Sequence, residues 1–236
     1  MWKETRFDKA ISLDKTAVIV CDVWDQHWCA SATRRVGEMV QKMNEVIQAA
    51  RDSGALIIHA PSGTLSAYAD TPARRRAIEA PKTMPPFPVN SGQGLDRSKE
   101  AALPIDDSDG GCDCQPQCHQ YSAWTAQHAG IEIKDEDAIS DSGQEIYNLL
   151  QQHDVENVII MGVHTNMCVL GRPFGIRQMV RLKRNPILVR DLTDTMYNPR
   201  KRPFVSHAEG TELVVRHIEK YWCLTTLSDD LLNELR

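Results

Sequence analysis

Short apolar runs recur along the chain, and segments with helical periodicity separate them. Such runs are typical of strands buried on both faces of a parallel sheet. They cover residues 16–22, 55–59, 131–134, 158–163 and 186–191, with a further candidate at 223–227. Apolar positions between 36 and 50 share one helix face that ends at Gly54, and similar stripes follow the later runs. The alternation predicts an α/β fold, a Rossmann-like three-layer αβα sandwich around a mainly parallel sheet of about six strands.

The segment from about 62 to 130 interrupts this alternation. It is rich in Pro, Gly, Asp and Ser and is much longer than an ordinary connection. We expect an ordered insertion after the second strand, with a helix near 72–80, lying over the carboxyl edge of the sheet. The chain contains no internal repeat, so we interpret residues 1–236 as a single domain.

Composition and charge narrow the class of protein. The 236 residues are 42% hydrophobic and 25% charged, an ordinary globular composition. The net charge of −5 is scattered without a basic block, so we expect no nucleic-acid partner. No run approaches the roughly 18 apolar residues of a membrane span, so we expect no membrane partner. The first six residues are too polar for a signal peptide, which favours a cytoplasmic protein and leaves an exported form open.

Three polar residues lie at or just after the ends of predicted strands, where open α/β sheets bind ligands. They are Asp22, Lys134 and Cys168. Cys168 follows a strand and a small-residue turn at the start of a predicted helix, a position that favours the thiolate. Asp22 would accept the thiol proton and Lys134 would stabilise negative charge nearby. Taken alone, Asp22 suits a capping or turn role equally well.

Three motifs carry a resemblance to the isochorismatase-like cysteine hydrolases, which include nicotinamidases and N-carbamoyl amidases. Residues 17–23 resemble the strand with the catalytic aspartate, 133–143 the lysine segment, and 162–169 the nucleophile motif. The resemblance implies catalysis by Asp22, Lys134 and Cys168. It implies a cysteine-dependent amidohydrolase that cleaves an amide, ureido or carbamoyl C–N bond of a small molecule through a thioester. The alternative is a non-catalytic member of the fold that binds a metabolite or a partner.

The resemblance also implies a cis peptide bond between Val163 and His164. The backbone N–H groups of His164 and Cys168 would then form an oxyanion hole. The resemblance further leads us to expect a homo-oligomer that acts without a cofactor.

The sequence departs from the family around the predicted site. Residues 24–29 replace the family's Gln-Asn-Asp-Phe-like run, and residues 60–64 lack the Asp-x-His metal ligands of nicotinamidases. We therefore expect no metal in the active site. Candidate substrate-binding residues are Trp24, His27, Trp28, His59, Arg172 and Tyr197. The tryptophans and His59 also have structural alternatives to substrate binding. The tryptophans would pack in the core, and His59 would be a buried, hydrogen-bonded histidine.

A cysteine cluster in the insertion stands apart from these motifs. Cys112, Cys114 and Cys118, followed by His119, suit a structural zinc site, a disulfide within the loop, or free thiols. The spacing matches no common zinc module, and the three interpretations stay open. A redox protein that uses these cysteines is the weakest competing function.

Overall fold

Six parallel strands form a central sheet in the computed structural model, which describes residues 3–89 and 92–235. Along the sheet their order is β3-β2-β1-β4-β5-β6. The strands are β1 (Thr16–Cys21), β2 (Leu56–Ala60), β3 (Ala138–Ile139), β4 (Asn157–Val163), β5 (Asn185–Asp194) and β6 (Leu224–Thr226). Every pairing between these strands is parallel, so the predicted α/β class and sheet are confirmed.

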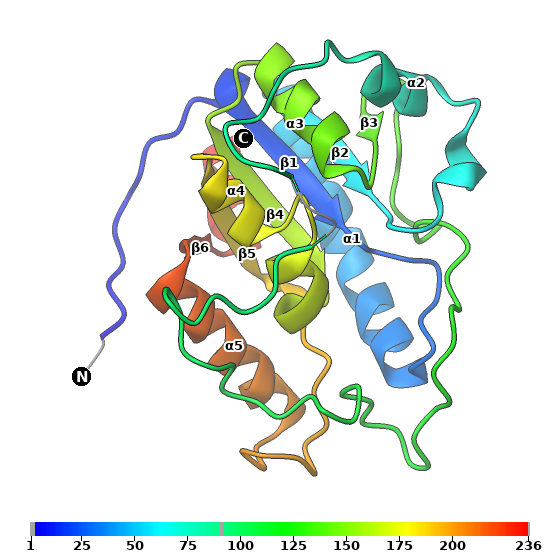
Figure 1. The fold of residues 1–236 in the computed structure, drawn as a ribbon, viewed down its shortest axis with the longest axis vertical. Helices are drawn as coiled ribbons and strands as arrows, with labels where there is room; N and C mark the ends of the chain where they lie inside the picture. Colours follow the sequence, from blue (N-terminus) through cyan, green and yellow to red (C-terminus); the bar gives the residue numbers. More distant parts are fainter. Residues whose placement is uncertain (1–2, 90–91, 236) are drawn as a thin grey trace.

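Helices cover both faces of this sheet (Figure 1). Helices α1 (Ala30–Asp52) and α6 (Ser228–Leu235) pack on one face. The opposite face carries α2 (Pro72–Glu79), α3 (Gly143–Gln152), α4 (Ile176–Arg181) and α5 (His207–Tyr221). Every residue of β1 and β4 is buried, as strands covered on both faces require. The result is the expected three-layer sandwich.

Polar caps fix several helix starts. Ser206 and Glu209 form a capping box at α5, while the side chains of Thr71 and Ser142 accept backbone N–H groups at α2 and α3. The predicted helix near 72–80 is therefore confirmed. Helix α6 follows the last strand and was not predicted.

The third predicted strand was wrong. Residues 131–134 form no strand; a turn in which the Asp137 N–H donates to the Lys134 carbonyl follows them, and β3 begins only at Ala138. The alternation Ile-Glu-Ile-Lys resembles a strand, but only Ile131 of the four is fully buried. The true strand has two residues, too few for a periodic signal.

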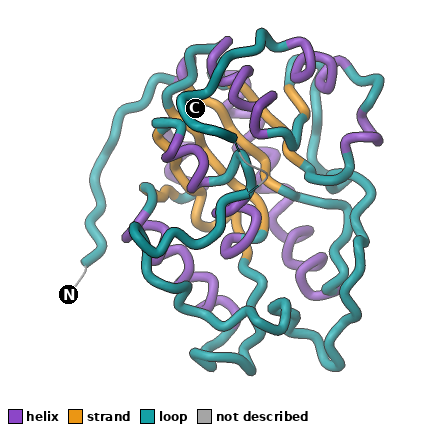
Figure 2. The backbone as a smooth tube through the Cα atoms, viewed as in Figure 1, coloured by secondary structure: helices purple, strands orange, loops and turns teal. Residues whose placement is uncertain are grey.

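The long connection between β2 and β3 passes below the carboxyl ends of β1 and β4 (green in Figure 1) and is mostly loop in Figure 2. Its described residues contain a 3-10 turn (Leu65–Tyr68) and α2, and no helix or strand from 80 to 137. Its end pairs with the chain after β1, since the N–H groups of Asp25 and His128 donate to the carbonyls of Ala126 and Val23. The connection therefore reaches the predicted site.

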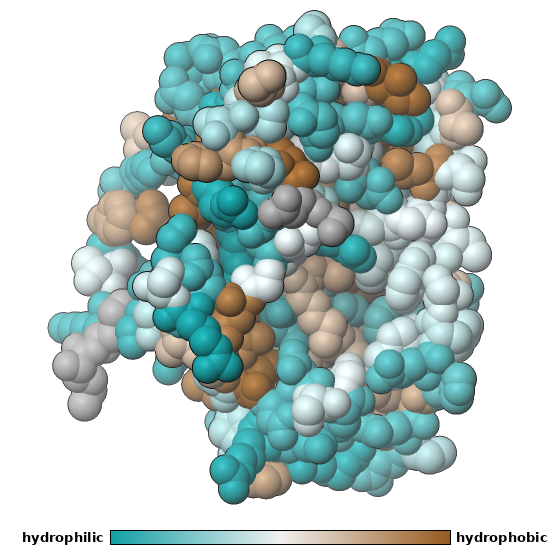
Figure 3. All heavy atoms as spheres, in the orientation of Figure 1, coloured by the Kyte–Doolittle hydropathy of each residue, from teal (hydrophilic) through white to brown (hydrophobic). Residues whose placement is uncertain are grey.

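The described part of the chain has no helix long and apolar enough to cross a bilayer. Polar side chains cover most of the face in Figure 3, and apolar ones form smaller patches.

We expect Asp137→Asn to destabilise the fold by about 3–5 kcal/mol, because it leaves the Arg51 charge buried without its carboxylate. Arg51 donates to both Asp137 oxygens at 2.9 and 2.8 Å, and His59 Nε2 lies 3.1 Å from Asp137 Oδ2. Urea unfolding at pH 7 measures the change, and the exposed Asp70→Asn is the matched control. Equal unfolding midpoints for the two variants would contradict the expectation.

The pH dependence of that network has a definite sign. Burial opposes ionisation of Asp137, but hydrogen bonds from His59 and Arg51 lower its pKa to about 2. A lowered carboxyl pKa stabilises the fold above the unfolded-state value near 4, by about 2 kcal/mol. That stability is lost as the pH falls from about 4 through about 2.

Candidate active site

Asp22 lies at the carboxyl end of β1, and its side chain is completely buried. The Ser62 N–H donates to its Oδ1 at 2.8 Å, and Arg172 Nε donates to its Oδ2 at 2.7 Å. Its backbone takes the left-handed conformation with φ of 50°, which is unfavourable for a non-glycine residue and tends to occur at functional sites. Both carboxylate oxygens are therefore held in fixed directions.

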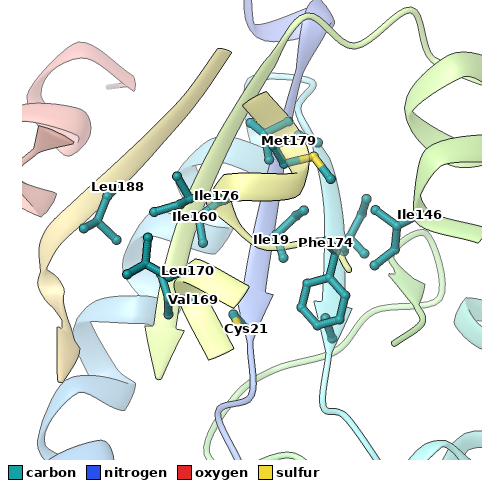
Figure 4. Close-up of a cluster of buried hydrophobic side chains, with 14 of the residues drawn as sticks. Ile19, Cys21, Ile146, Ile160, Val169, Leu170, Phe174, Ile176, Met179 and Leu188 are labelled. Atoms are coloured by element: carbon teal, nitrogen blue, oxygen red, sulfur yellow. The ribbon is translucent and has the colours of Figure 1, made fainter. Parts of the chain in front are cut away.

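Cys168 lies beside Asp22 because β1 and β4 are neighbours. Gly162, near the end of β4, has φ of 119°, and a Cβ there would lie 2.0 Å from the Cys21 carbonyl oxygen. The short helical turn Thr165–Val169 follows, and Val169 and Leu170 anchor it in the core (Figure 4). The Cys168 thiol lies close enough to the Asp22 carboxylate for each group to shift the pKa of the other.

Burial and the Asp22 charge raise the pKa of the Cys168 thiol to about 12. Burial also raises the pKa of Asp22, against the opposing effect of Arg172. A resting thiolate, which the sequence led us to expect, is therefore not favoured. The short helical turn does not offset the rise in the thiol pKa that burial and the neighbouring carboxylate cause. The geometry instead poises a thiol to lose its proton directly to Asp22.

We expect alkylation of resting Cys168 by iodoacetamide to be slow at pH 7 and to accelerate about tenfold per pH unit. A raised thiol pKa leaves only a small thiolate fraction at neutral pH, and that fraction grows with pH. Mass mapping after timed labelling measures the rate, and unfolded protein is the control for reagent quality. A rate at pH 7 that already equals the rate at pH 9 would contradict the raised pKa.

Arg172 is the cation that pairs with Asp22. Lys134 lies in the loop before β3, and its Nζ is 3.8 Å from Glu132 Oε1. Arg172 follows Cys168 by one helical turn, its N–H donating to the Cys168 carbonyl, and its guanidinium pairs with Asp22. We expected Arg172 to bind a substrate carboxylate and Lys134 to stabilise negative charge nearby. The ion pair with Asp22 comes from Arg172.

His164 lies between the nucleophile and an aromatic wall. The bond between Val163 and His164 is cis, as expected, and the His164 backbone N–H acts to lower the pKa of the Cys168 thiol. Its imidazole meets His27 edge-on, with ring centroids 4.7 Å apart. Burial lowers the pKa of His164 to about 3 and that of His27 to about 4, so both rings are neutral at pH 7.

The aromatic wall continues from His27 to Trp24. Trp24 stacks on Trp124 of the long connection, with centroids 4.4 Å apart, and its Nε1 donates to the Ser62 carbonyl. Trp24, His27, His164 and Asp22 line one small cavity. Sequence reasoning missed Trp124, because its distance along the chain hides the contact. Trp28 instead packs against the cysteines of the long connection.

A larger cleft of about 360 Å³ opens on the other side of Arg172. Its lining comes from the segment after β2, the start of α3 and the turn after Cys168; it comprises Ser62, Gly63, Val89, Asp141, Ser142, Gly143, Gln144, Arg172 and Pro173. Since Ser62 and Arg172 both bind Asp22, this cleft adjoins the reactive groups.

Two predicted substrate-binding residues lie in the core. His59 is fully buried, with Nε2 on Asp137 and Nδ1 on the Gln127 amide. Tyr197 is also fully buried, and its hydroxyl donates to the Lys201 carbonyl. Neither side chain lines a described cavity beside Asp22.

The segment after β2 does not fit a metal ion. Its residues 60–64 contain no carboxylate or imidazole, the Ser62 N–H is committed to Asp22, and the Thr64 hydroxyl donates to the Pro61 carbonyl. Divalent ions in such pockets require charged or imidazole ligands. These residues therefore supply no set of metal ligands at this position.

Comparison with solved structures finds similar folds among known hydrolases. A cysteine hydrolase from Pseudomonas syringae pv. phaseolicola matches with a TM-score of 0.61 and 17% identity over 99% of this chain and 98% of that one. An isochorismatase from Pseudomonas putida matches with a TM-score of 0.56 and 13% identity, covering 95% and 94%. The zinc complex of Pyrococcus horikoshii pyrazinamidase matches with a TM-score of 0.51 and 15% identity, covering 90% and 99%.

Sequence comparison adds nothing to these structural matches. No protein-family model matches the chain, and no curated protein matches its sequence. The structural matches extend over nearly the whole chain. The chain therefore has the fold of the isochorismatase-like cysteine hydrolases.

Proposed function

We propose that this protein is a cysteine-dependent hydrolase that cleaves a C–N bond in a small amide, ureido or carbamoyl compound. The observation that carries the proposal is the position of the Cys168 thiol near the Asp22 carboxylate, whose charge raises the thiol pKa and which accepts from Arg172 Nε. A thiol beside an oriented base is the arrangement that nucleophilic catalysis needs. The fold shared with a cysteine hydrolase and a pyrazinamidase supports the same reaction class.

The first half of the reaction forms a thioester. Asp22 takes the proton of Cys168 as the sulfur attacks the substrate carbonyl carbon, giving a tetrahedral oxyanion. The N–H groups of His164 and Cys168 are our candidates to stabilise that oxyanion. Asp22 then returns the proton to the leaving nitrogen as the C–N bond breaks, which releases ammonia or an amine.

The second half reverses these roles. Asp22 takes a proton from water, the hydroxyl attacks the thioester carbon, and the proton returns to the Cys168 sulfur as the acid is released. Arg172 supports both halves, because its charge favours the carboxylate form of Asp22 and opposes the rise in the thiol pKa. Neutral His27 and Trp24 give the site an uncharged wall suited to a small planar substrate.

A screen of small amides, ureas and carbamoyl compounds for ammonia release tests the proposal. We expect release from at least one compound by the wild type and none by Cys168→Ala. Saturable binding of a compound with no release from any of them would favour the alternative, a non-catalytic binding protein.

We expect Lys134→Ala to retain turnover within about threefold of the wild type. Its ammonium lies 3.8 Å from Glu132 Oε1, whereas the positive charge paired with Asp22 comes from Arg172. The amide found in the screen provides the assay. A loss of two orders of magnitude would restore the lysine to the catalytic group.

A further inference from the structure

Cysteines from two distant parts of the chain meet beside the aromatic wall. Cys29, Cys112 and Cys114 place their sulfur atoms within 4.8 Å of one another, and the sulfurs of Cys29 and Cys114 are 4.0 Å apart. Cys118 packs against the same group. Cys29 and Cys112 are completely buried, and Cys114 and Cys118 are half-buried. Four cysteine side chains therefore lie in one packed cluster.

The spacing of these sulfurs fits one tetrahedral ion. A Zn–S bond of about 2.3 Å places two sulfurs of a tetrahedral site about 3.8 Å apart. A disulfide needs about 2.05 Å and joins only two of the sulfurs. The cluster supplies a third close sulfur and a fourth beside it, which is the number that a closed structural zinc site uses.

The loop that presents Cys112 and Cys114 is held by specific contacts. Gly110 and Gly111 have φ of 80° and 74°, and a Cβ on Gly111 would lie 2.3 Å from the Met196 carbonyl oxygen. Asp109 accepts from the Gly111 N–H and from the Asn198 amide. These contacts orient the two sulfurs before any ion binds.

Charged groups and a helix end surround the sulfurs. Cys29 is the N-cap residue of α1, and its side chain makes no capping hydrogen bond. Anions are favoured at such a helix N-terminus. Arg35, in the first turns of α1, is already paired with Asp113 and Asp194, and the Cys29 sulfur lies 3.8 Å from Asp113 Oδ1. The positive charge that balances thiolates here therefore has to come largely from a bound cation.

We propose that Cys29, Cys112 and Cys114, completed by Cys118, bind one zinc ion. All-sulfur ligands select zinc and other soft cations over magnesium, calcium or manganese. In this ligand set Cys29 takes the place of His119, which the sequence suggested beside the three cysteines of the long connection. The ion joins the long connection to the start of α1, next to His27 and Trp28, and so supports the aromatic wall. The site stands independently of the proposed hydrolase activity.

Zinc content of the purified full chain tests this site. Protein reduced, stripped with a chelator, reloaded with Zn²⁺ and desalted should hold about one zinc per chain. The double variant, which combines Cys29→Ala with Cys114→Ala, should hold about tenfold less zinc than the wild type. Cys223→Ala, a matched change at a half-buried cysteine in another part of the fold, should hold as much zinc as the wild type. Equal zinc in the double variant and the wild type overturns the proposal.

Two further measurements keep the test decisive if the double variant fails to fold. Co²⁺ in place of zinc should give wild-type protein the sulfur-to-cobalt charge-transfer absorption and the visible bands of a tetrahedral thiolate site. Zinc should also raise the Tm of stripped wild-type protein, because it binds the folded state. Absence of the cobalt bands, or a mass two hydrogens lower that shows a disulfide among these four cysteines in freshly isolated protein, overturns the zinc assignment.

Discussion

Replacing Cys168 with alanine abolishes turnover, with an expected loss of about 10⁴–10⁶-fold in kcat, while the protein still folds. The side chain is only half-buried, and the helical turn around it is anchored by Val169 and Leu170. Asp22→Asn should lose a comparable factor, because an amide cannot accept the thiol proton. Ammonia release from the amide found in the screen, with circular dichroism as the folding control, measures both effects.

A double variant that combines Cys168→Ala with Asp22→Asn shows whether the two residues act as one catalytic unit or contribute to the rate independently. Since Asp22 and Cys168 act in one proton transfer, the double variant should be little slower than either single variant. Multiplied losses would show that the two residues act separately. Near-normal turnover in Cys168→Ala would remove the thiol mechanism.

Replacing Arg172 has the second largest expected effect. Arg172→Leu should lower kcat/KM by about 10²–10⁴-fold, because Asp22 stays buried without its cation. The sign of the pH effect follows from that pair. Arg172 lowers the pKa of Asp22, so its removal raises that pKa and moves the acidic limb of the pH profile to higher pH.

The matched variants separate charge from structure. Arg172→Lys should show a smaller shift of the acidic limb, because it keeps the charge and loses the directed Nε contact. Arg75→Leu, at an exposed arginine of α2, should match the wild type in rate and pH profile. An unshifted acidic limb in Arg172→Leu would contradict the role of the ion pair.

The sequence predicted the sheet, and the positions of Asp22 and Cys168 at its carboxyl edge, for one physical reason. Continuous apolar runs such as 16–22 and 158–163 admit few structures other than buried parallel strands. Once β1 and β4 are neighbours, the segments that follow their carboxyl ends must meet. Asp22 and Cys168 lie in those two segments. This part of the site follows from local pattern and topology.

The rest depended on contacts that local patterns do not contain. Lys134 was placed by an alternating tetrapeptide that forms no strand, whereas Arg172 reaches Asp22 through the direction of one short turn. Trp124 stacks on Trp24 across the long connection. Cys29 and Cys114 meet although 85 residues separate them. Loop paths of this length are set by tertiary packing, which no periodicity in the sequence records.

Mapping a covalent adduct tests the central claim most directly. Protein mixed with the amide found in the screen is quenched in acid during turnover, digested and analysed by mass spectrometry. The account predicts the substrate's acyl group on the peptide that contains Cys168, formed in the wild type and absent from Cys168→Ala. An acyl group on another residue, with turnover retained in Cys168→Ala, would contradict it.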